Sequence, residues 1–194
     1  MLFNSLEFIF LFLPATLFFY YTLLRYGNGS IACLFLLCSS LIFYGYWNPK
    51  YLYLIIGSIV LNYCCGRLII SKKVQENLLI QRFLLAGGII FNISAIGYFK
   101  YANFLVENIN KVGDFSFTLE KIVLPLAISF FTFQQIAFLI DSYRGIVKEY
   151  NFFNYALFVT FFPQLIAGPI VHQKEMMPQF AKQLRGQVSN SFMI

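Results

Sequence analysis

The last apolar stretch of the chain runs from Phe152 to Val171 and contains Phe161-Phe162-Pro163-Gln164-Leu165-Ile166-Ala167-Gly168-Pro169-Ile170. The prolines and the glycine in this segment remove backbone hydrogen bonds and weaken a helix. Because lipid offers no replacement partners, protein or trapped water must satisfy the backbone groups that are left open. The stretch therefore predicts a broken helix that is sheltered by neighbouring membrane segments.

The composition of the chain indicates a membrane protein. Hydrophobic residues make up 59% of its 194 residues and charged residues only 11%, whereas a soluble domain carries about 25% charged residues. The formal net charge is +6, but the basic residues lie between apolar segments, where the positive-inside rule accounts for them. This placement argues against a nucleic-acid-binding domain.

Five further apolar stretches precede the broken one. We expect helices over residues 8–24, 31–46, 51–70, 83–99 and 122–140, with a kink at Pro14 in the first. The second is expected to fall slightly short of a hydrocarbon core of roughly 30 Å. The polar stretch from 100 to 121 begins with an amphipathic pattern, which predicts a helix lying on the membrane surface. That pattern comprises Phe104, Leu105, Asn108, Ile109 and Val112.

Lysine and arginine predict the orientation of the segments. The connection after the third stretch carries Arg67, Lys72, Lys73 and Arg82 against Glu76, and we place it in the cytoplasm. Alternation then puts the N-terminus and the 100–121 region outside.

The basic residues beyond the broken stretch bear on its path. They are Lys174, Lys182 and Arg185. A full crossing would leave them outside, against the charge rule, whereas a segment that dips in and returns keeps them in the cytoplasm. We therefore predict a re-entrant helical segment.

Polar residues follow two sides of the fifth stretch. Ser129, Thr132 and Gln135 share one side of the predicted helix, while Gln134 and Asp141 lie on another. These side chains need protein or water around them, and two interpretations stay open. They either hydrogen-bond to neighbouring helices or line a pathway.

The single histidine, His172, follows the broken stretch. It could act as a general base near the end of a re-entrant loop, or it could be an interfacial residue that hydrogen-bonds a loop. The four cysteines have no metal-ligand spacing, so no metal site is expected. Without a P-loop or nucleophile-elbow motif, motifs alone assign no reaction.

Taken in order, the motifs of the chain resemble one family. They are Leu2-Phe-Asn-Ser-Leu-Glu-Phe8, Phe43-Tyr-Gly-Tyr-Trp-Asn-Pro-Lys50, Gly97-Tyr-Phe-Lys-Tyr101, Pro125-Leu-Ala-Ile-Ser-Phe-Phe-Thr-Phe-Gln-Gln135 and the Phe161–Ile170 segment. This series closely resembles bacterial membrane-bound O-acyltransferases of the alginate O-acetylation type, with the teichoic-acid D-alanylation enzyme as a relative. The resemblance runs from residue 1 to about Phe180.

The resemblance implies a fold and an activity. The fold is an all-α, polytopic transmembrane bundle, of which residues 1–180 form the N-terminal portion and 181–194 a polar, divergent tail. The activity is transfer of an acyl group, acetyl above all, to hydroxyls of an exported polysaccharide such as alginate. The resemblance further implies acetyl-CoA or an acyl carrier as co-substrate with no bound cofactor, partner proteins on the extracytoplasmic side, and a multi-pass location in the bacterial inner membrane.

The resemblance also assigns candidate site residues. The catalytic histidine of the family lies on a later membrane segment, so we expect this chain to be a truncated portion that is inactive alone. The residues expected to line a tunnel or substrate path are Ser129, Thr132, Gln134, Gln135, Gln164, Gly168 and Pro169. Two alternatives remain: a transporter or channel subunit, since discontinuous helices build solute sites, and a non-catalytic remnant scaffold.

Overall fold

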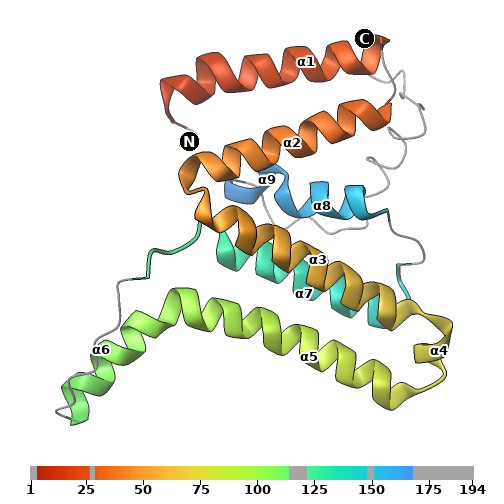
Figure 1. Cartoon of the computed structure of the whole chain (residues 1–194), viewed down its shortest axis with the longest axis vertical. Coiled ribbons are helices and arrows are strands. Elements are labelled where there is room, and N and C mark those ends of the chain that lie inside the picture. Colours follow the sequence, from red (N-terminus) through yellow and green to blue (C-terminus); the bar gives the residue numbers. More distant parts are fainter. Residues whose placement is uncertain (1–3, 27–28, 114–121, 148–150, 168–194) are drawn as a thin grey trace. The chain divides into compact units, whose positions relative to one another are not determined.

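The computed structural model describes residues 4–26, 29–113, 122–147 and 151–167 (Figure 1). In these ranges every regular element is a helix, which confirms the all-α prediction. The chain divides into two compact units. Unit 1 contains the described residues up to Val60 and those from Asn151 onward, and unit 2 begins at Leu61. Helix α3 (Lys50–Ile70) contributes to both units.

Unit 1 is arranged around helix α2 (Gly29–Trp47). Helix α2 packs against α1 (Leu13–Tyr26) on one side and against α8 (Phe152–Thr160) and α9 (Phe162–Ala167) on another, as Figure 1 shows. Its side chains Ala32, Phe43 and Tyr44 are almost completely buried. Helix α2 is therefore the central element of this unit.

Four phenylalanine rings fix the start of α9 in unit 1. The ring of Phe162 lies 5.4 Å from Phe12, 5.5 Å from Phe43 and 6.0 Å from Phe8 between centroids. Phe8 and Phe12 belong to the π-helical turn η1 (Phe8–Phe12), and Phe43 belongs to α2. Most of these contacts are edge-on or tilted, the arrangement that aromatic pairs favour. The aromatic cluster therefore ties α9 to two other elements.

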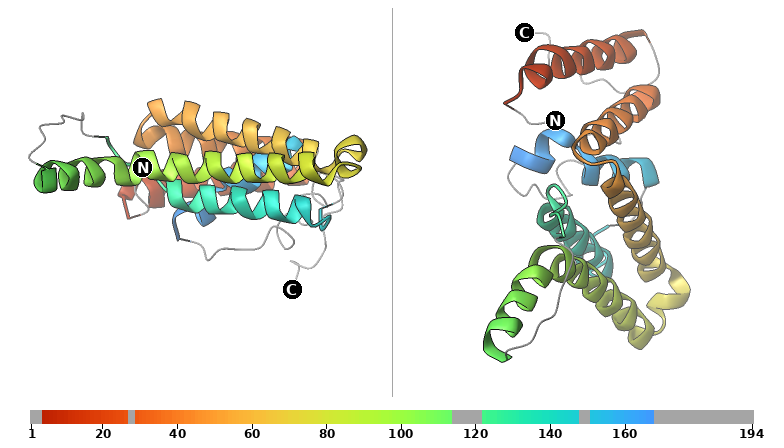
Figure 2. Two further views of the ribbon diagram at one scale, coloured as in Figure 1. Left: turned by 90° about the horizontal axis from the view of Figure 1, so that it is seen from below. Right: turned by 60° about the vertical axis from the view of Figure 1, so that its left-hand side comes forward.

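Unit 2 is built on two long helices that lie side by side, α5 (Leu78–Ile96) and α7 (Ile128–Tyr143) (Figure 2). Glycines allow close packing here, because a Cβ at Gly66 of α3 would overlap the Phe138 ring. A Cβ at Gly88 of α5 would lie 2.6 Å from Leu139 Cδ1. The short helix α4 (Lys72–Gln75) joins α3 to α5. Beyond α5 the chain continues through the π-helical turn η2 (Gly97–Tyr101) into α6 (Ala102–Gly113).

Four described helices are long and apolar enough to cross a membrane by length and composition. They are Phe8–Tyr26, Gly29–Tyr46, Lys50–Ile70 and the continuous run Leu78–Gly113. The chain is a multi-pass membrane protein. The second span is longer than the predicted 31–46, because α2 begins at Gly29 and ends at Trp47, which brings it within the range of about 17–25 residues that can cross a bilayer. Its 19 residues reach about 28 Å at 1.5 Å per residue.

Two further predicted helix starts differ from the structure by five or six residues. The fifth stretch was expected to be helical from 122, but α7 begins only at Ile128. Pro125 lacks an N–H and disfavours helical backbone at the residue before it, and Ala127 takes a left-handed φ of 54°. The fourth stretch begins earlier, at Leu78, because the Asn77 side chain caps it by accepting hydrogen bonds from the N–H groups of Leu79 and Ile80.

Two helical irregularities lie near prolines. The π-helical turn η1 ends directly before the α-helix that contains Pro14, while the kink expected at Pro14 itself stays a prediction. The last apolar stretch is broken at Phe161, whose φ of −53° and ψ of 103° end α8. Pro163 then sits in the first turn of α9, where a missing N–H costs no hydrogen bond. The part of this stretch from 168 to 171 lies outside the described residues, so the re-entrant path stays a prediction.

Candidate functional site

Helix α7 carries most of the candidate polar side chains, and protein surrounds them. Thr132, Gln134 and Gln135 are 1%, 3% and 0% exposed, while Ser129 and Asp141 are half-buried. The outward side of the helix is apolar, with Phe133 exposed. The helix therefore meets the requirement that protein or water must shelter both of its polar sides.

Gln135 takes part in a network of amide side chains inside unit 2. Asn62 Nδ2 on α3 donates to Gln135 Oε1 at 2.9 Å, and Asn92 Nδ2 on α5 donates to Asn62 Oδ1 at 2.6 Å. Asn92 Nδ2 also donates to the backbone carbonyl of Gly88 at 2.7 Å. The network joins three helices through buried hydrogen bonds, which is what the interhelical interpretation of Gln135 expects.

Sequence reasoning missed Asn92 as a member of this network. The available signal was a single asparagine in an otherwise apolar stretch, because such a residue must find a partner in the membrane. Asn62 carries the same signal on α3. A tunnel-lining role for Gln135 stays a prediction, and the network gives this residue a structural role in any case.

Gln134 differs from its neighbour. Its side chain is 3% exposed, yet its Oε1 atom accepts no hydrogen bond from the described residues. A buried acceptor without a donor costs about 1–3 kcal/mol. Such an atom is suited to accept a hydrogen bond from a hydroxyl group or a water molecule that enters the helix bundle.

Gln164 is the most unusual polar residue of unit 1. Its side chain is 5% exposed, and neither its Nε2 nor its Oε1 atom has a hydrogen-bond partner among the described residues. The neighbouring aromatic cluster around Phe162 holds the helix that carries it. The amide can donate to a carbonyl and accept from a hydroxyl, so Gln164 presents both halves of a hydrogen-bonding site.

Two further buried atoms of unit 1 share this property. Tyr44 Oη on α2 and Asn154 Oδ1 on α8 have no hydrogen-bond partner among the described residues. Neither residue was a candidate from the sequence. The chain contains many tyrosines and asparagines, and nothing in the spacing of these two singles them out. The buried polar side chains of the described part are hydroxyls and neutral amides. They can recognise a ligand by hydrogen bonding but not by charge.

Three candidates fall outside the described residues: Gly168, Pro169 and His172. Their assignments stay predictions.

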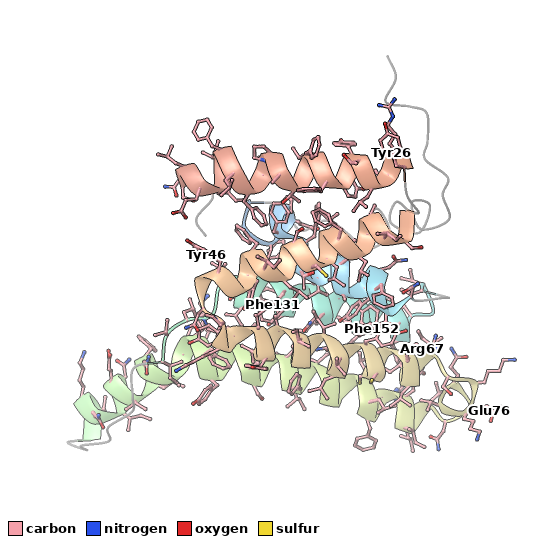
Figure 3. All side chains as sticks on the ribbon, turned by 45° about the horizontal axis from the view of Figure 1, so that its top comes forward. Tyr26, Tyr46, Arg67, Glu76, Phe131 and Phe152 are labelled. Carbon is pink, nitrogen blue, oxygen red and sulfur yellow. The ribbon has the colours of Figure 1, made fainter. Side chains whose placement is uncertain are left out.

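The charged turn between α3 and α5 lies within the described residues. Figure 3 shows Arg67 and Glu76 near this turn, and both side chains are exposed, as are Lys72 and Lys73. An exposed, basic end of unit 2 is compatible with the cytoplasmic orientation that the charges predict.

Comparison with known proteins shows that the chain is similar to polysaccharide O-acetylases over most of its length. It is 44% identical to the peptidoglycan O-acetyltransferase of Helicobacter pylori over 93% of the chain and 38% of that relative. It is 41% identical to the "Probable alginate O-acetylase AlgI" of Pseudomonas aeruginosa, over 93% of the chain and 34% of the relative. The protein of the same name from Pseudomonas syringae pv. tomato is also 41% identical, over 93% of the chain and 35% of the relative.

The chain spans about a third of the length of these curated relatives. No protein-family model and no solved structure matches it. Over nearly all of its residues the chain is a relative of bacterial peptidoglycan and alginate O-acetylases, which confirms its resemblance to membrane-bound O-acyltransferases of the alginate O-acetylation type.

Proposed function

We propose that the chain forms part of a membrane O-acetyltransferase that transfers acetyl groups to hydroxyls of an exported polysaccharide. The observation that carries this proposal is the 44% identity to a peptidoglycan O-acetyltransferase over 93% of the chain. The candidate membrane-spanning helices support it, because a bundle that crosses the bilayer can bring an acyl donor on one side close to an acceptor on the other. The bacterial inner membrane is the location that fits such a reaction.

The reaction joins an acyl thioester to an alcohol. The donor is acetyl-CoA or an acyl carrier that approaches from the cytoplasm, and the acceptor is a sugar hydroxyl outside. The hydroxyl oxygen forms a new bond to the acyl carbon while the carbon–sulfur bond breaks, and the hydroxyl proton passes through a general base to the leaving thiol. We place that base beyond the described residues, and a dry path to it would protect the thioester from water.

Within unit 1, the proposed role of Gln164 is to line this path. Its amide is buried, and neither of its polar atoms has a hydrogen-bond partner among the described residues. Gly168 and Pro169, which follow Gln164 in the sequence, are assigned to the same path, and path-lining roles for Ser129, Thr132 and Gln134 of unit 2 remain separate predictions. We assign Gln164 to the acyl carbonyl or the acceptor hydroxyl, because its amide can satisfy either group.

The acceptor is a polysaccharide hydroxyl in this proposal, and partner proteins on the extracytoplasmic side would deliver or hold the polymer. The two kinds of relative are named for peptidoglycan and for alginate. The described residues offer neutral hydrogen-bonding groups, which suit an acetyl ester and hydroxyls alike. Acetyl is therefore favoured over a charged D-alanyl group.

The test is isotopic labelling of envelope polysaccharides. Cells that carry the gene and cells from which it has been deleted receive ¹³C-acetate, and ester-linked acetate is released with mild base and measured by mass spectrometry. The proposal predicts that deletion removes labelled ester from one polysaccharide fraction and that the intact gene restores it. Unchanged labelling of every fraction after deletion would contradict the proposal.

A further inference from the structure

Helix α6 presents three different faces around its axis. Its apolar stripe, defined by Phe104, Leu105, Ile109 and Val112, is exposed, with side chains that are 48–90% accessible. Apolar side chains of this size rarely gather on a water-facing surface unless something covers them. In a helix the spacing of these residues puts them on one side. The stripe therefore requires an apolar partner.

A second face of α6 contacts the chain itself. Ala102, Asn103, Val106 and Asn110 are half-buried and recur at helical spacing. Asn103 Nδ2 donates to the backbone carbonyl of Ile122 at 3.2 Å, which attaches this face to the segment before α7. The apolar stripe thus points away from the unit that α6 is attached to, the reverse of a helix that packs on a soluble core.

A third face of α6 is charged. At about 100° per residue, Glu107 lies on the side opposite Leu105 and Val112. Glu107 is exposed, and so is Lys111, which borders the stripe. A lysine in that position can bury its stem against lipid and keep its ammonium group in water. The helix therefore offers one apolar, one charged and one protein-facing side.

The junction between α5 and α6 has the composition of a membrane boundary. Helix α5 continues without a break through η2 into α6, and Figure 1 shows that the helix axis bends where the two meet. The junction contains Tyr98, Phe99 and Tyr101, and the Lys100 ammonium group lies 5.4 Å from the centre of the Tyr101 ring. Tyrosine and lysine are enriched where a span leaves the hydrocarbon core.

We propose that α6 lies flat in the membrane–water boundary, with Phe104, Leu105, Ile109 and Val112 inserted among lipid acyl chains. Glu107 then faces water, and the half-buried side rests against unit 2. Because α6 and the basic α4 turn lie at opposite ends of α5, the leaflet is the one facing away from the cytoplasm by the charge rule. The lipid surface is favoured over a protein partner because the stripe continues a span that is itself in lipid.

The experiment places an environment-sensitive fluorescent amino acid at single positions of the full-length protein by amber suppression. Leu105 and Val112 represent the stripe, and Glu107 is the matched control on the same helix. The purified variants are reconstituted in vesicles of phosphatidylglycerol and phosphatidylethanolamine, with and without acyl chains that carry bromine. Quenching by bromine reports contact with lipid, and quenching by iodide reports contact with water.

The proposal predicts strong bromine quenching and a blue-shifted emission at 105 and 112, with at least threefold stronger iodide quenching at 107. Protection of 105 and 112 from both quenchers would mean that protein covers the stripe and would overturn the proposal. Iodide quenching of all three positions alike would overturn it as well. The readout does not depend on acetyl transfer, so its failure would leave the proposed enzymatic function standing.

Discussion

Asn62 on α3 donates a hydrogen bond of 2.9 Å to Gln135 on α7, a residue 73 positions away in the sequence, inside unit 2. The same asparagine accepts from Asn92 at 2.6 Å. Side-chain hydrogen bonds between membrane helices contribute about 0.6 kcal/mol on average and up to about 2 kcal/mol. The network therefore holds α3, α5 and α7 in register, with a modest energy that is specific to these partners.

The first prediction concerns the coupling within this network. Replacing Asn62→Leu and Gln135→Leu should each lower the stability of the protein by about 1–2 kcal/mol, because each removes a hydrogen bond and leaves a buried partner. The double variant should cost less than the sum of the two, since it leaves neither partner of this bond behind. Unfolding in mild detergent, followed by circular dichroism, measures the three values. Strict additivity would show that the two residues do not interact.

The second prediction concerns close packing at Gly66. A methyl group there would overlap the Phe138 ring, whereas a methyl group at Gly57 on the same helix meets no atom within 4 Å. Gly66→Ala should therefore destabilise the protein by about 1–3 kcal/mol. Gly57→Ala should be neutral or gain up to about 1 kcal/mol from helix propensity. Thermal unfolding of both variants decides the matter, and equal melting temperatures would refute the packing shown here.

The third prediction concerns orientation. Lys73 lies on the exposed turn between α3 and α5, and Glu107 lies on α6 at the far end of α5. In intact spheroplasts, a cysteine placed at 107 should react with an impermeant maleimide, and a cysteine at 73 should react only after permeabilisation. The parent protein gives the background labelling. Labelling of position 73 from outside would reverse the assigned topology.

Several features of the fold follow from the sequence because they depend on local chemistry. The helix break near Phe161 is one, since Pro163 and the following residues limit the backbone whatever surrounds them. The polar sides of α7 are another, because helical periodicity fixes which residues share a face. Both predictions needed no knowledge of neighbouring helices.

Other features depend on contacts that periodicity does not encode. The pattern indicates that Gln135 needs shelter, but it does not indicate that Asn62 and Asn92 provide it. The late start of α7 has the same kind of origin. The left-handed Ala127 and the turn after Pro125 interrupt a stretch that is apolar enough to read as helix. For Gln164, the sequence predicted a place in the tunnel wall but not a buried amide whose two polar atoms both lack partners.

The final prediction separates the buried glutamines Gln135 and Gln164 by their roles. Gln164→Leu removes a polar group that has no hydrogen-bond partner among the described residues, so it should leave stability unchanged or raise it. If the amide binds the acyl group or the hydroxyl, the same change should lower acetyl transfer about tenfold, which corresponds to roughly 1.4 kcal/mol. Gln135→Leu should lower stability, because it removes the hydrogen bond between Asn62 and Gln135 that holds α3 and α7 together.

The most direct measurement is therefore the rate of ¹⁴C-acetyl transfer to polysaccharide in native membrane vesicles, where the rest of the proposed enzyme is present, for Gln164→Leu against the parent at equal amounts of folded protein. Our account predicts a rate about tenfold lower with a melting temperature that is equal or higher. An unchanged rate at unchanged stability would contradict the claim that this buried amide lines the path of the acetyl group.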